Sequence, residues 1–447
     1  MQKILIANRG EIALRIIKTC KEMNIETIAI YSDADVDMPF VKEATKAIRI
    51  GEPPVNKSYL RSDLILEIAK QEGVDGIHPG YGFLSENAAF ASQVQAEGII
   101  FIGPSPKTIE LMGDKIVSRT TMQNAGVPVV PGSSLGVVNE EEACALANRI
   151  GFPVMLKASG GGGGIGMIRC EDEQALVKSF ASTKSRAKAY FGSDEVFVEK
   201  CIENARHVEV QIFGDSFGNV VHMFERDCSV QRRNQKVIEE SPSPFLSVAT
   251  KEKMFETAIL AAKSVNYLNA GTIEFIVDEE ENYYFLEMNT RLQVEHPVTE
   301  MITGQDLVKW QILVARGERL PLLQTELIQK GHAIEFRLYA EDPITFLPSP
   351  GKITSLKWPD LMGARIDSGY ESGQTVSPFY DPMIAKCIMN GENRADALAV
   401  SQEFFEEYSI EGIKTNAPLF LEILKNEEFI RGNYTTAFLT KKITNKN

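Results

Sequence analysis

Short apolar runs alternate with amphipathic stretches along the first hundred or so residues. The runs lie at residues 4–7, 27–30 and 99–102. Such runs are typical of parallel strands buried on both faces. Between the first two, Ile12, Ile16 and Cys20 share one face of a helix. The pattern predicts an open parallel βαβ sheet. Because the turn at residues 8–11 lacks the glycine fingerprint of dinucleotide-binding folds, we interpret this domain as a scaffold.

The pattern changes after residue 113, where proline and glycine interrupt the chain. A smaller unit is expected at about residues 131–203. Its elements are predicted as strands at 153–158, 167–170 and 196–199 and a helix at 172–190. Further on we expect a helix near 255–265, a hairpin around 272–289, and a last segment that opens with a strand at 333–339 and closes with a helix-rich tail. The chain is therefore predicted to be a multidomain α/β and α+β protein with domains at 1–114, 115–330 and 331–447.

Composition excludes several classes of function. The 447 residues carry 47 Lys and Arg against 61 Asp and Glu, a net charge of −14, so nucleic acid and anionic membranes are poor partners. No apolar stretch is long enough to cross a membrane. The six Cys form no Cys-x-x-Cys pair, and the start of the chain has no secretion signal. We expect a soluble, cytoplasmic protein with reduced thiols.

The glycine-rich segment at residues 160–166 is the most conspicuous local feature. Consecutive glycines lose much backbone entropy on ordering, which a structural loop has no reason to require. The chain continues as a strand rather than as the helix of a P-loop. Because Lys157 ends the preceding strand, this hairpin loop is interpreted as a mobile lid over a nucleotide. The alternative is a flexible surface tip.

The hairpin at residues 271–289 carries two carboxylates on one face. With the turn centred between residues 280 and 281, Glu274 lies opposite Glu287, and Asn289 projects from the same face. Directly opposed carboxylates repel each other, and a hard divalent cation removes that repulsion. The pattern therefore predicts a site for Mg²⁺ or Mn²⁺. The alternative is a solvated outer face.

The residues after the hairpin add an oxyanion site. Arg291, Gln293 and Glu295 are two apart, so they share the metal face if the extended run continues to Pro297. Such a set could bind a small oxyanion and accept its proton. A simple ion pair between Glu295 and Arg291 is the alternative, and His296 is interpreted as a packing or capping residue.

These motifs together resemble biotin carboxylase of the ATP-grasp superfamily. The resemblance rests on Lys157 with the glycine loop and on residues 7–13, 78–83, 225–229, 287–297 and 348–352, in order along nearly the whole chain. It implies an N-terminal pre-ATP-grasp domain at 1–114, an ATP-grasp domain at 115–330 and a mixed α/β C-terminal domain at 331–447. The lid would lie at about 131–203.

The resemblance also implies a role for individual residues. ATP would be bound by Lys115, Lys157, Gly163, Gly164, Glu199, Lys200, Cys201, Ile202, His207, Asn234, Glu274 and Glu287. Two Mg²⁺ or Mn²⁺ ions would be held by Glu274, Glu287 and Asn289. Bicarbonate would be bound by Lys236, Arg291, Gln293, Val294 and Glu295, and biotin by Tyr81 and Arg337. The catalytic residues would be Glu295, Arg291, Lys236 and Arg337. Asn234 stands where some relatives carry His.

The implied activity is ATP-dependent carboxylation of biotin through carboxyphosphate. The sequence has no Met-Lys-Met biotin-attachment motif, so biotin is expected on a separate biotin carboxyl carrier protein that works with carboxyltransferase subunits. We expect the first half-reaction of acetyl-CoA carboxylase in fatty acid synthesis. Alternatives are a split pyruvate or other acyl-CoA carboxylase, another ATP-grasp ligase, or a silent regulatory homologue.

A homodimer is expected from the same resemblance. The helix face with Arg15, Lys18 and Glu22 resembles part of the dimer interface of the family. A plain solvated face is an equal interpretation of these residues.

Overall fold

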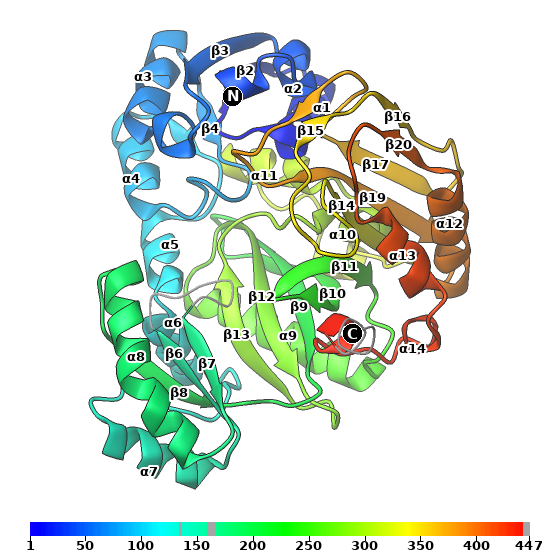
Figure 1. The fold of residues 1–447 in the computed structure, drawn as a ribbon. Helices are drawn as coiled ribbons and strands as arrows, with labels where there is room; N and C mark the ends of the chain where they lie inside the picture. Colours follow the sequence, from blue (N-terminus) through cyan, green and yellow to red (C-terminus); the bar gives the residue numbers. More distant parts are fainter. Residues whose placement is uncertain (134–135, 159–165, 441–447) are drawn as a thin grey trace.

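The computed structural model describes residues 1–133, 136–158 and 166–440. The N-terminal part is a parallel sheet with strand order β3-β2-β1-β4-β5, at the top left of Figure 1. Its strands are β1 (Lys3–Ile6), β2 (Glu26–Ser32), β3 (Lys46–Gly51), β4 (Gly76–His78) and β5 (Ile100–Phe101). Its helices are α1 (Gly10–Glu22), α2 (Pro39–Glu43), α3 (Ser62–Glu72), α4 (Ala88–Ala96) and α5 (Pro106–Gly113). The predicted open parallel sheet is confirmed. Strands β3 and β4 were missed: the side chains of β3 are mostly part-exposed, and β4 is only 3 residues long.

The predicted lid unit is a separate lobe at the lower left of Figure 1. Strands β6 (Val154–Ala158), β7 (Met167–Cys170) and β8 (Val196–Lys200) form an antiparallel sheet. Helices α7 (Glu140–Ile150) and α8 (Glu173–Phe191) pack on it, and α6 (Lys115–Asn124) leads into it. Asn139 and Asp172 cap α7 and α8 by accepting backbone N–H bonds. The strands at the predicted positions are confirmed, whereas residues 159–165 of the glycine loop lie outside the described residues.

The remaining described residues are built on one antiparallel sheet of eight strands, in the order β13-β12-β9-β10-β11-β14-β19-β17. Its strands are β9 (Arg206–Gly214), β10 (Val220–Arg232), β11 (Gln235–Ser241), β12 (Asn269–Val277), β13 (Tyr283–Asn289), β14 (His332–Tyr339), β17 (Ala364–Ser368) and β19 (Met383–Gly391). Because β11 pairs with β14, the sheet continues across residue 330. Residues far apart in sequence are thereby fixed on one surface.

Helices and short strands surround this sheet. The helices are α9 (Val248–Ser264), α10 (His296–Thr303), α11 (Leu307–Ala315), α12 (Arg394–Glu407), α13 (Ala417–Leu424) and α14 (Glu427–Ile430). The short strands are β15 (Gly351–Lys352), β16 (Ser355–Lys357), β18 (Thr375–Val376) and β20 (Ser409–Glu411). Within the described parts of the chain, none of the helices combines the length and apolar character that crossing a bilayer demands.

The β12–β13 hairpin confirms the predicted register at the pair of glutamates and differs from it towards the turn. Glu274 pairs with Glu287, as predicted, but Phe275 pairs with Phe285. Leu286 is therefore an extra residue, a bulge that moves the turn centre from between residues 280 and 281 onto Glu280. The turn is closed by the side chain of Asp278, whose Oδ1 accepts backbone N–H bonds from two turn residues.

The predicted extension of β13 to Pro297 is wrong. The strand ends at Asn289, and α10 begins at His296 with Pro297 in its first turn. Proline is favoured there because its missing N–H is one that the helix leaves unpaired. His296 is fully buried and its Nδ1 lies 2.8 Å from the carbonyl of Gln293, in agreement with a packing role.

Helix α1 is joined to the rest of the molecule by buried charges. Arg15 Nη2 lies 2.7 Å from Glu300 Oε1, and Arg365 Nη1 lies 2.8 Å from Glu300 Oε2. Arg15 is thus buried, so the alternative of a plain solvated face is wrong for this residue. The side chains of Lys18 and Glu22 are exposed. Glu300 connects the N-terminal domain to β17.

Replacing Glu300 by Ala should strongly destabilise the protein. The buried Arg15 and the half-buried Arg365 would lose a shared partner, and breaking a buried ion pair costs about 3 kcal/mol or more. The unfolding midpoint in urea should fall clearly. Glu427→Ala is the control, because its ion pair with Arg431 is exposed and should contribute well under about 1 kcal/mol. Equal midpoints for the two variants would contradict this account.

Candidate active site

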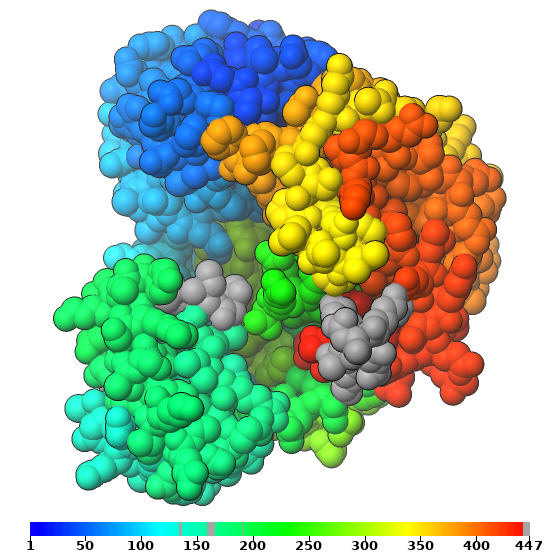
Figure 2. All heavy atoms as spheres, in the orientation of Figure 1, coloured from blue at the N-terminus to red at the C-terminus, as the bar shows by residue number. Residues whose placement is uncertain are grey.

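A cavity of about 810 Å³ lies between the three parts of the molecule. Figure 2 shows it as a hollow bordered by the blue N-terminal part, the green lobe and the yellow to red C-terminal part. Most residues predicted for the site line it: Tyr81, Lys115, Lys157, His207, Asn234, Lys236, Glu274, Glu287, Asn289, Arg291, Gln293, Val294 and Arg337. Asn8, Arg9 and Phe83 of the N-terminal domain also line it. That domain is therefore more than the scaffold we expected.

Other predicted residues lie outside the cavity lining. Gly163 and Gly164 are outside the described residues, and Glu199, Lys200, Cys201 and Ile202 lie at the end of β8 and beyond it. The Lys200 ammonium donates to the carbonyls of Gly151 and Phe152 at 3.0 Å. The Glu199 carboxylate pairs with Lys157 and lies 3.4 Å from Arg119. In this arrangement the lobe neutralises part of the positive charge of Lys157.

Lys236 is the electrostatic centre of the site. Its Nζ lies 2.6 Å from Glu209, 2.8 Å from Glu274 and 2.6 Å from Glu295. These side chains come from β11, β9, β12 and the start of α10. Burial lowers the pKa of Lys236, but the three carboxylates raise it well above its usual value. The lysine is therefore a fixed positive charge.

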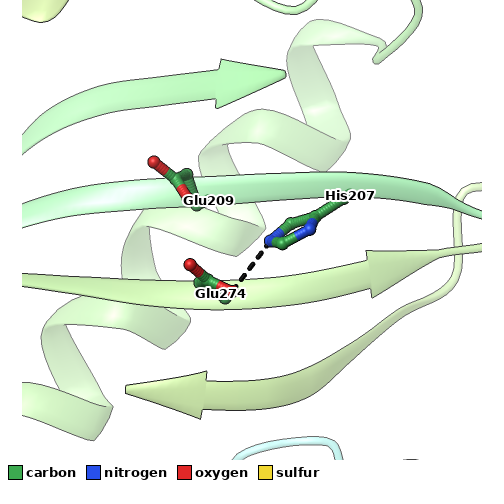
Figure 3. Close-up of side chains that lie close together, drawn as sticks. All are labelled: His207, Glu209 and Glu274. Atoms are coloured by element: carbon green, nitrogen blue, oxygen red, sulfur yellow. Dashed lines mark ion pairs between the residues drawn. The ribbon is translucent and has the colours of Figure 1, made fainter. Parts of the chain in front are cut away.

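Figure 3 shows a second feature of this cluster, in which His207 is directed at Glu274 from the neighbouring strand, with Glu209 beside them. His207 Nε2 lies 2.9 Å from Glu274 Oε2. Burial lowers the pKa of His207, and Glu274 more than offsets this, so that the pKa is raised. The three side chains are close enough to ligate a metal ion. However, the Lys236 ammonium already bonds to both carboxylates and offsets part of their charge.

The hairpin end is better suited to a divalent cation. Glu274 and Glu287 are directly opposed, and Asn289 Nδ2 donates to Glu274 at 2.9 Å. The Glu287 side chain is 37% exposed, and Lys115 Nζ lies 3.5 Å from it. Two carboxylates and an amide oxygen beside an open cavity are the ligand types that Mg²⁺ and Mn²⁺ prefer, with water and phosphate completing the shell. The residues present fit such an ion.

Glu295 is fully buried behind the cavity wall, at the N-cap position of α10. Each of its two oxygens pairs with a different cation: Oε1 bonds to Lys236, and Oε2 lies 2.9 Å from Arg337. Burial raises the pKa of Glu295, but these cations lower it well below its usual value. The carboxylate is therefore ionised and able to accept a proton.

Arg291 does not form the ion pair with Glu295 that we considered. It binds Glu86 of the N-terminal domain at 2.9 Å, Gln293 at 2.8 Å and Asn289 at 3.0 Å. The guanidinium is thus held by both the hairpin and the N-terminal domain. It remains at the cavity wall, where an anion can reach it.

The sequence analysis missed several charged residues that support the site. Glu209 and Arg226 are fully buried and 2.6 Å apart, and Glu239 binds Arg337. One signal was available, because His207, Glu209 and Gln211 alternate along a strand that is buried throughout. Polar residues at a period of two in a buried strand indicate a functional face. Glu86 gave no such signal.

Profiles of known families match most of the chain. The profile described as biotin carboxylase, N-terminal domain, matches residues 1–109. That described as carbamoyl-phosphate synthase L chain, ATP binding domain, matches residues 114–323, and biotin carboxylase C-terminal domain matches residues 335–441.

Known proteins are similar to this chain over almost its full length. Biotin carboxylase of Halalkalibacterium halodurans is 56% identical over 442 residues, which cover 99% of this chain and 98% of the relative. The biotin carboxylase domain dimer of Hydrogenobacter thermophilus 2-oxoglutarate carboxylase, solved with MgADP, ADP and bicarbonate, has a TM-score of 0.95 at 46% identity, with 98% and 97% covered. A crystal structure of the biotin carboxylase part of pyruvate carboxylase has a TM-score of 0.86 at 47% identity, with 99% and 98% covered.

A cavity bordered by a separate lobe, with lysines facing a hairpin of carboxylates, is typical of the ATP-grasp class of ATP-dependent ligases, to which the fold and the family profiles assign this chain. Within that class, the chain belongs to the biotin carboxylase family.

Replacing Lys236 by Met should destabilise the protein as well as the site. Three carboxylates would lose their shared cation, at a cost of about 3–5 kcal/mol. The thermal unfolding midpoint reports this loss. Lys309→Met is the control, since Lys309 is exposed on α11 and its replacement should leave the midpoint nearly unchanged. An unchanged midpoint in Lys236→Met would show that the cluster is not held by this ammonium.

Proposed function

We propose that this protein uses ATP and bicarbonate to carboxylate biotin. The observation that carries the proposal is Glu295, an ionised, fully buried carboxylate behind the cavity wall. It is held between Lys236 and Arg337, which line a cavity that also contains a suitable cation site. A proton acceptor, cations for an anionic substrate and residues for a nucleotide thus meet in one place.

Lys115 and Lys157 are proposed to bind the phosphates of ATP. Both line the cavity, from the start of α6 and from β6. Glu274, Glu287 and Asn289 would hold Mg²⁺ or Mn²⁺, which offsets the charge of the phosphates when bound. The similar 2-oxoglutarate carboxylase domain was solved with MgADP. On nucleotide binding, Lys157 would exchange its contact with Glu199 for a contact with a phosphate oxygen. Glu199 and the residues that follow it, up to 202, would then be free to bind the adenine of ATP.

The proposed roles of the other nucleotide-binding residues are based on the family resemblance. His207 and Asn234 both line the cavity, and Asn234 lies in the exposed turn between β10 and β11. An amide side chain there both donates and accepts hydrogen bonds. Gly163 and Gly164 are proposed to cover the phosphates and to limit the access of water.

Bicarbonate is proposed to bind between Arg291, Gln293, the Val294 backbone and Lys236. Glu295 would take its proton at a carboxylate oxygen, and the resulting anion would attack the γ-phosphoryl group in line. The bond from the γ-phosphorus to the bridging oxygen would break, giving carboxyphosphate and ADP. A bound anion would share the cations that stabilise ionised Glu295. The proton affinity of Glu295 would therefore rise when the substrate arrives, which favours transfer.

Biotin is proposed to bind near Tyr81 and Arg337. Arg337 projects from β14 into the cavity, and Tyr81 approaches from the N-terminal domain with its hydroxyl bonded to Glu11. After carboxyphosphate releases CO₂, phosphate would remove the ureido proton, and Arg291 would stabilise the biotin anion that captures CO₂.

We infer that the biotin is attached to a biotin carboxyl carrier protein. The carboxylated carrier would then deliver its carboxyl group to carboxyltransferase subunits of acetyl-CoA carboxylase, in fatty acid synthesis. The 98% coverage of the Halalkalibacterium halodurans biotin carboxylase supports this. The similarity to part of a pyruvate carboxylase supports the second candidate. Capture of this chain with its natural biotinylated carrier, followed by identification of the attached carboxyltransferase, distinguishes them.

A cytoplasmic homodimer is the proposed form. The similar 2-oxoglutarate carboxylase domain was solved as a dimer. Lys18 and Glu22 are exposed on α1, and Met362 is 97% exposed on the C-terminal domain. Sedimentation of the purified protein would contradict the proposal if it gave a monomer at all concentrations.

Glu295→Gln should remain folded and lose activity. An amide cannot accept the proton, and general-base catalysis contributes about 10²–10⁴-fold. The measurement is ADP release in the presence of ATP, Mg²⁺, bicarbonate and free biotin. Glu252→Gln, at an exposed position on α9, should release ADP at the original rate. Equal rates for both variants would refute the role of Glu295.

Glu287→Gln should raise the Mg²⁺ concentration needed for half-maximal activity by about tenfold or more, because one carboxylate ligand is lost. Excess Mg²⁺ should restore part of the rate, and a chelator should abolish it in both proteins. Glu279→Gln is the matched control, since it removes a charge from the exposed turn of the same hairpin. An unchanged Mg²⁺ requirement in Glu287→Gln would place the cation elsewhere.

A further inference from the structure

Two glutamates outside the proposed substrate contacts lie directly opposite each other in the central sheet. Glu239 on β11 pairs with Glu335 on β14, and both side chains are 0% exposed. Like charges directly opposite on a ladder repel each other, and burial removes the water that would screen them. Two ionised carboxylates at this position would be strongly unfavourable.

The hydrogen bonds of the two side chains are unequal. Glu239 Oε1 accepts from Arg337 Nε at 2.6 Å and lies 2.5 Å from Nη2. Among the residues that the structure describes, Glu239 Oε2 and both oxygens of Glu335 have no hydrogen-bond partner. A carboxylate can only accept, whereas a protonated carboxyl has a donor of its own. One proton between the pair would therefore provide the missing bond.

The charged groups around Glu335 leave it without a cation of its own. Arg337, on the same strand, is shared by Glu239 and Glu295. Lys386 on β19 bonds to the Val294 carbonyl at 2.9 Å and lies 3.2 Å from Glu11. The other titratable groups that interact with Glu335 are Tyr81 of the N-terminal domain and Cys387 of β19, and burial raises the pKa of both, so both are neutral. Helix α10, which packs against β14, carries His296, whose pKa is lowered by burial, so it is neutral as well.

We propose that Glu335 keeps one proton in the resting enzyme and donates a hydrogen bond through it to Glu239 Oε2, so that Glu335 is a positioning residue for Arg337. In its neutral form it fixes Glu239 and adds no negative charge. Arg337 then retains enough positive charge to stabilise Glu295 and an incoming anion. This inference rests on the proposed function, in which that anion is bicarbonate.

The protonation state of Glu335 should determine the pH above which activity falls. Burial, with Glu239 and Glu295 nearby, raises the pKa of Glu335 well above its usual value. The group is neutral below that raised pKa and becomes ionised as the pH rises through it. An added negative charge beside Arg337 would then repel bicarbonate. The KM for bicarbonate should rise at alkaline pH, while the KM for ATP should change little.

Glu335→Gln tests the proposal, because the amide reproduces a neutral donor that cannot ionise. We expect kcat/KM for bicarbonate near pH 7 to stay within about threefold of the original enzyme. At about pH 9 the KM for bicarbonate should be about tenfold lower in the variant, the effect of about one removed charge. Glu239→Gln, which removes the ion pair with Arg337, should lower kcat/KM at least about tenfold at every pH.

Infrared spectroscopy tests the proton without using activity. The original protein at neutral pH should have a protonated-carboxyl C=O band that is absent from Glu335→Gln. If the original protein showed this band but released no ADP, the proposed function would be refuted, whereas the proton shared by Glu239 and Glu335 would be supported. The inference is overturned if the band is missing or if Glu335→Gln does not fold. It is also overturned if kcat/KM for bicarbonate in this variant falls more than about tenfold near pH 7, or if its KM for bicarbonate still rises at alkaline pH.

Discussion

The site depends on one ammonium group buried among three carboxylates. Lys236 bonds to Glu209, Glu274 and Glu295 from three different elements. Each of these carboxylates alone would be costly to bury, and the lysine alone would lose its charge. Together they hold the proposed base, one proposed metal ligand and the sheet surface in fixed positions.

The eight-stranded sheet makes that arrangement possible. One rung places Glu287, Glu274, Glu209 and Arg226 on successive strands, and further along the sheet Arg337 pairs with Lys386. Three carboxylates on the hairpin side are thus followed by cations towards the C-terminal domain. Strand spacing sets the distances between them. The cation site lies on this sheet, and the buried base is bonded to it through Lys236.

The sequence predicted the features that depend on local periodicity. Alternation placed Glu274 opposite Glu287, and the structure has that pair. The prediction succeeded although its turn centre was wrong, because the bulge at Leu286 lies on the turn side of the pair. Glu86, Glu239 and Glu335 were missed because each meets its partner through the fold: Glu86 is 205 positions from Arg291. Long-range pairs of this kind leave no periodic trace in one sequence.

The central claim is that Glu295 receives the proton of bicarbonate while Lys236 and Arg291 hold the anion. The most direct test is a crystal structure with bicarbonate, Mg²⁺ and a non-hydrolysable ATP analogue. The account predicts a bicarbonate oxygen within about 3 Å of a Glu295 carboxylate oxygen and of Lys236 Nζ. Bicarbonate bound out of reach of Glu295, or a Glu295 that turns away when the substrates are present, would contradict it.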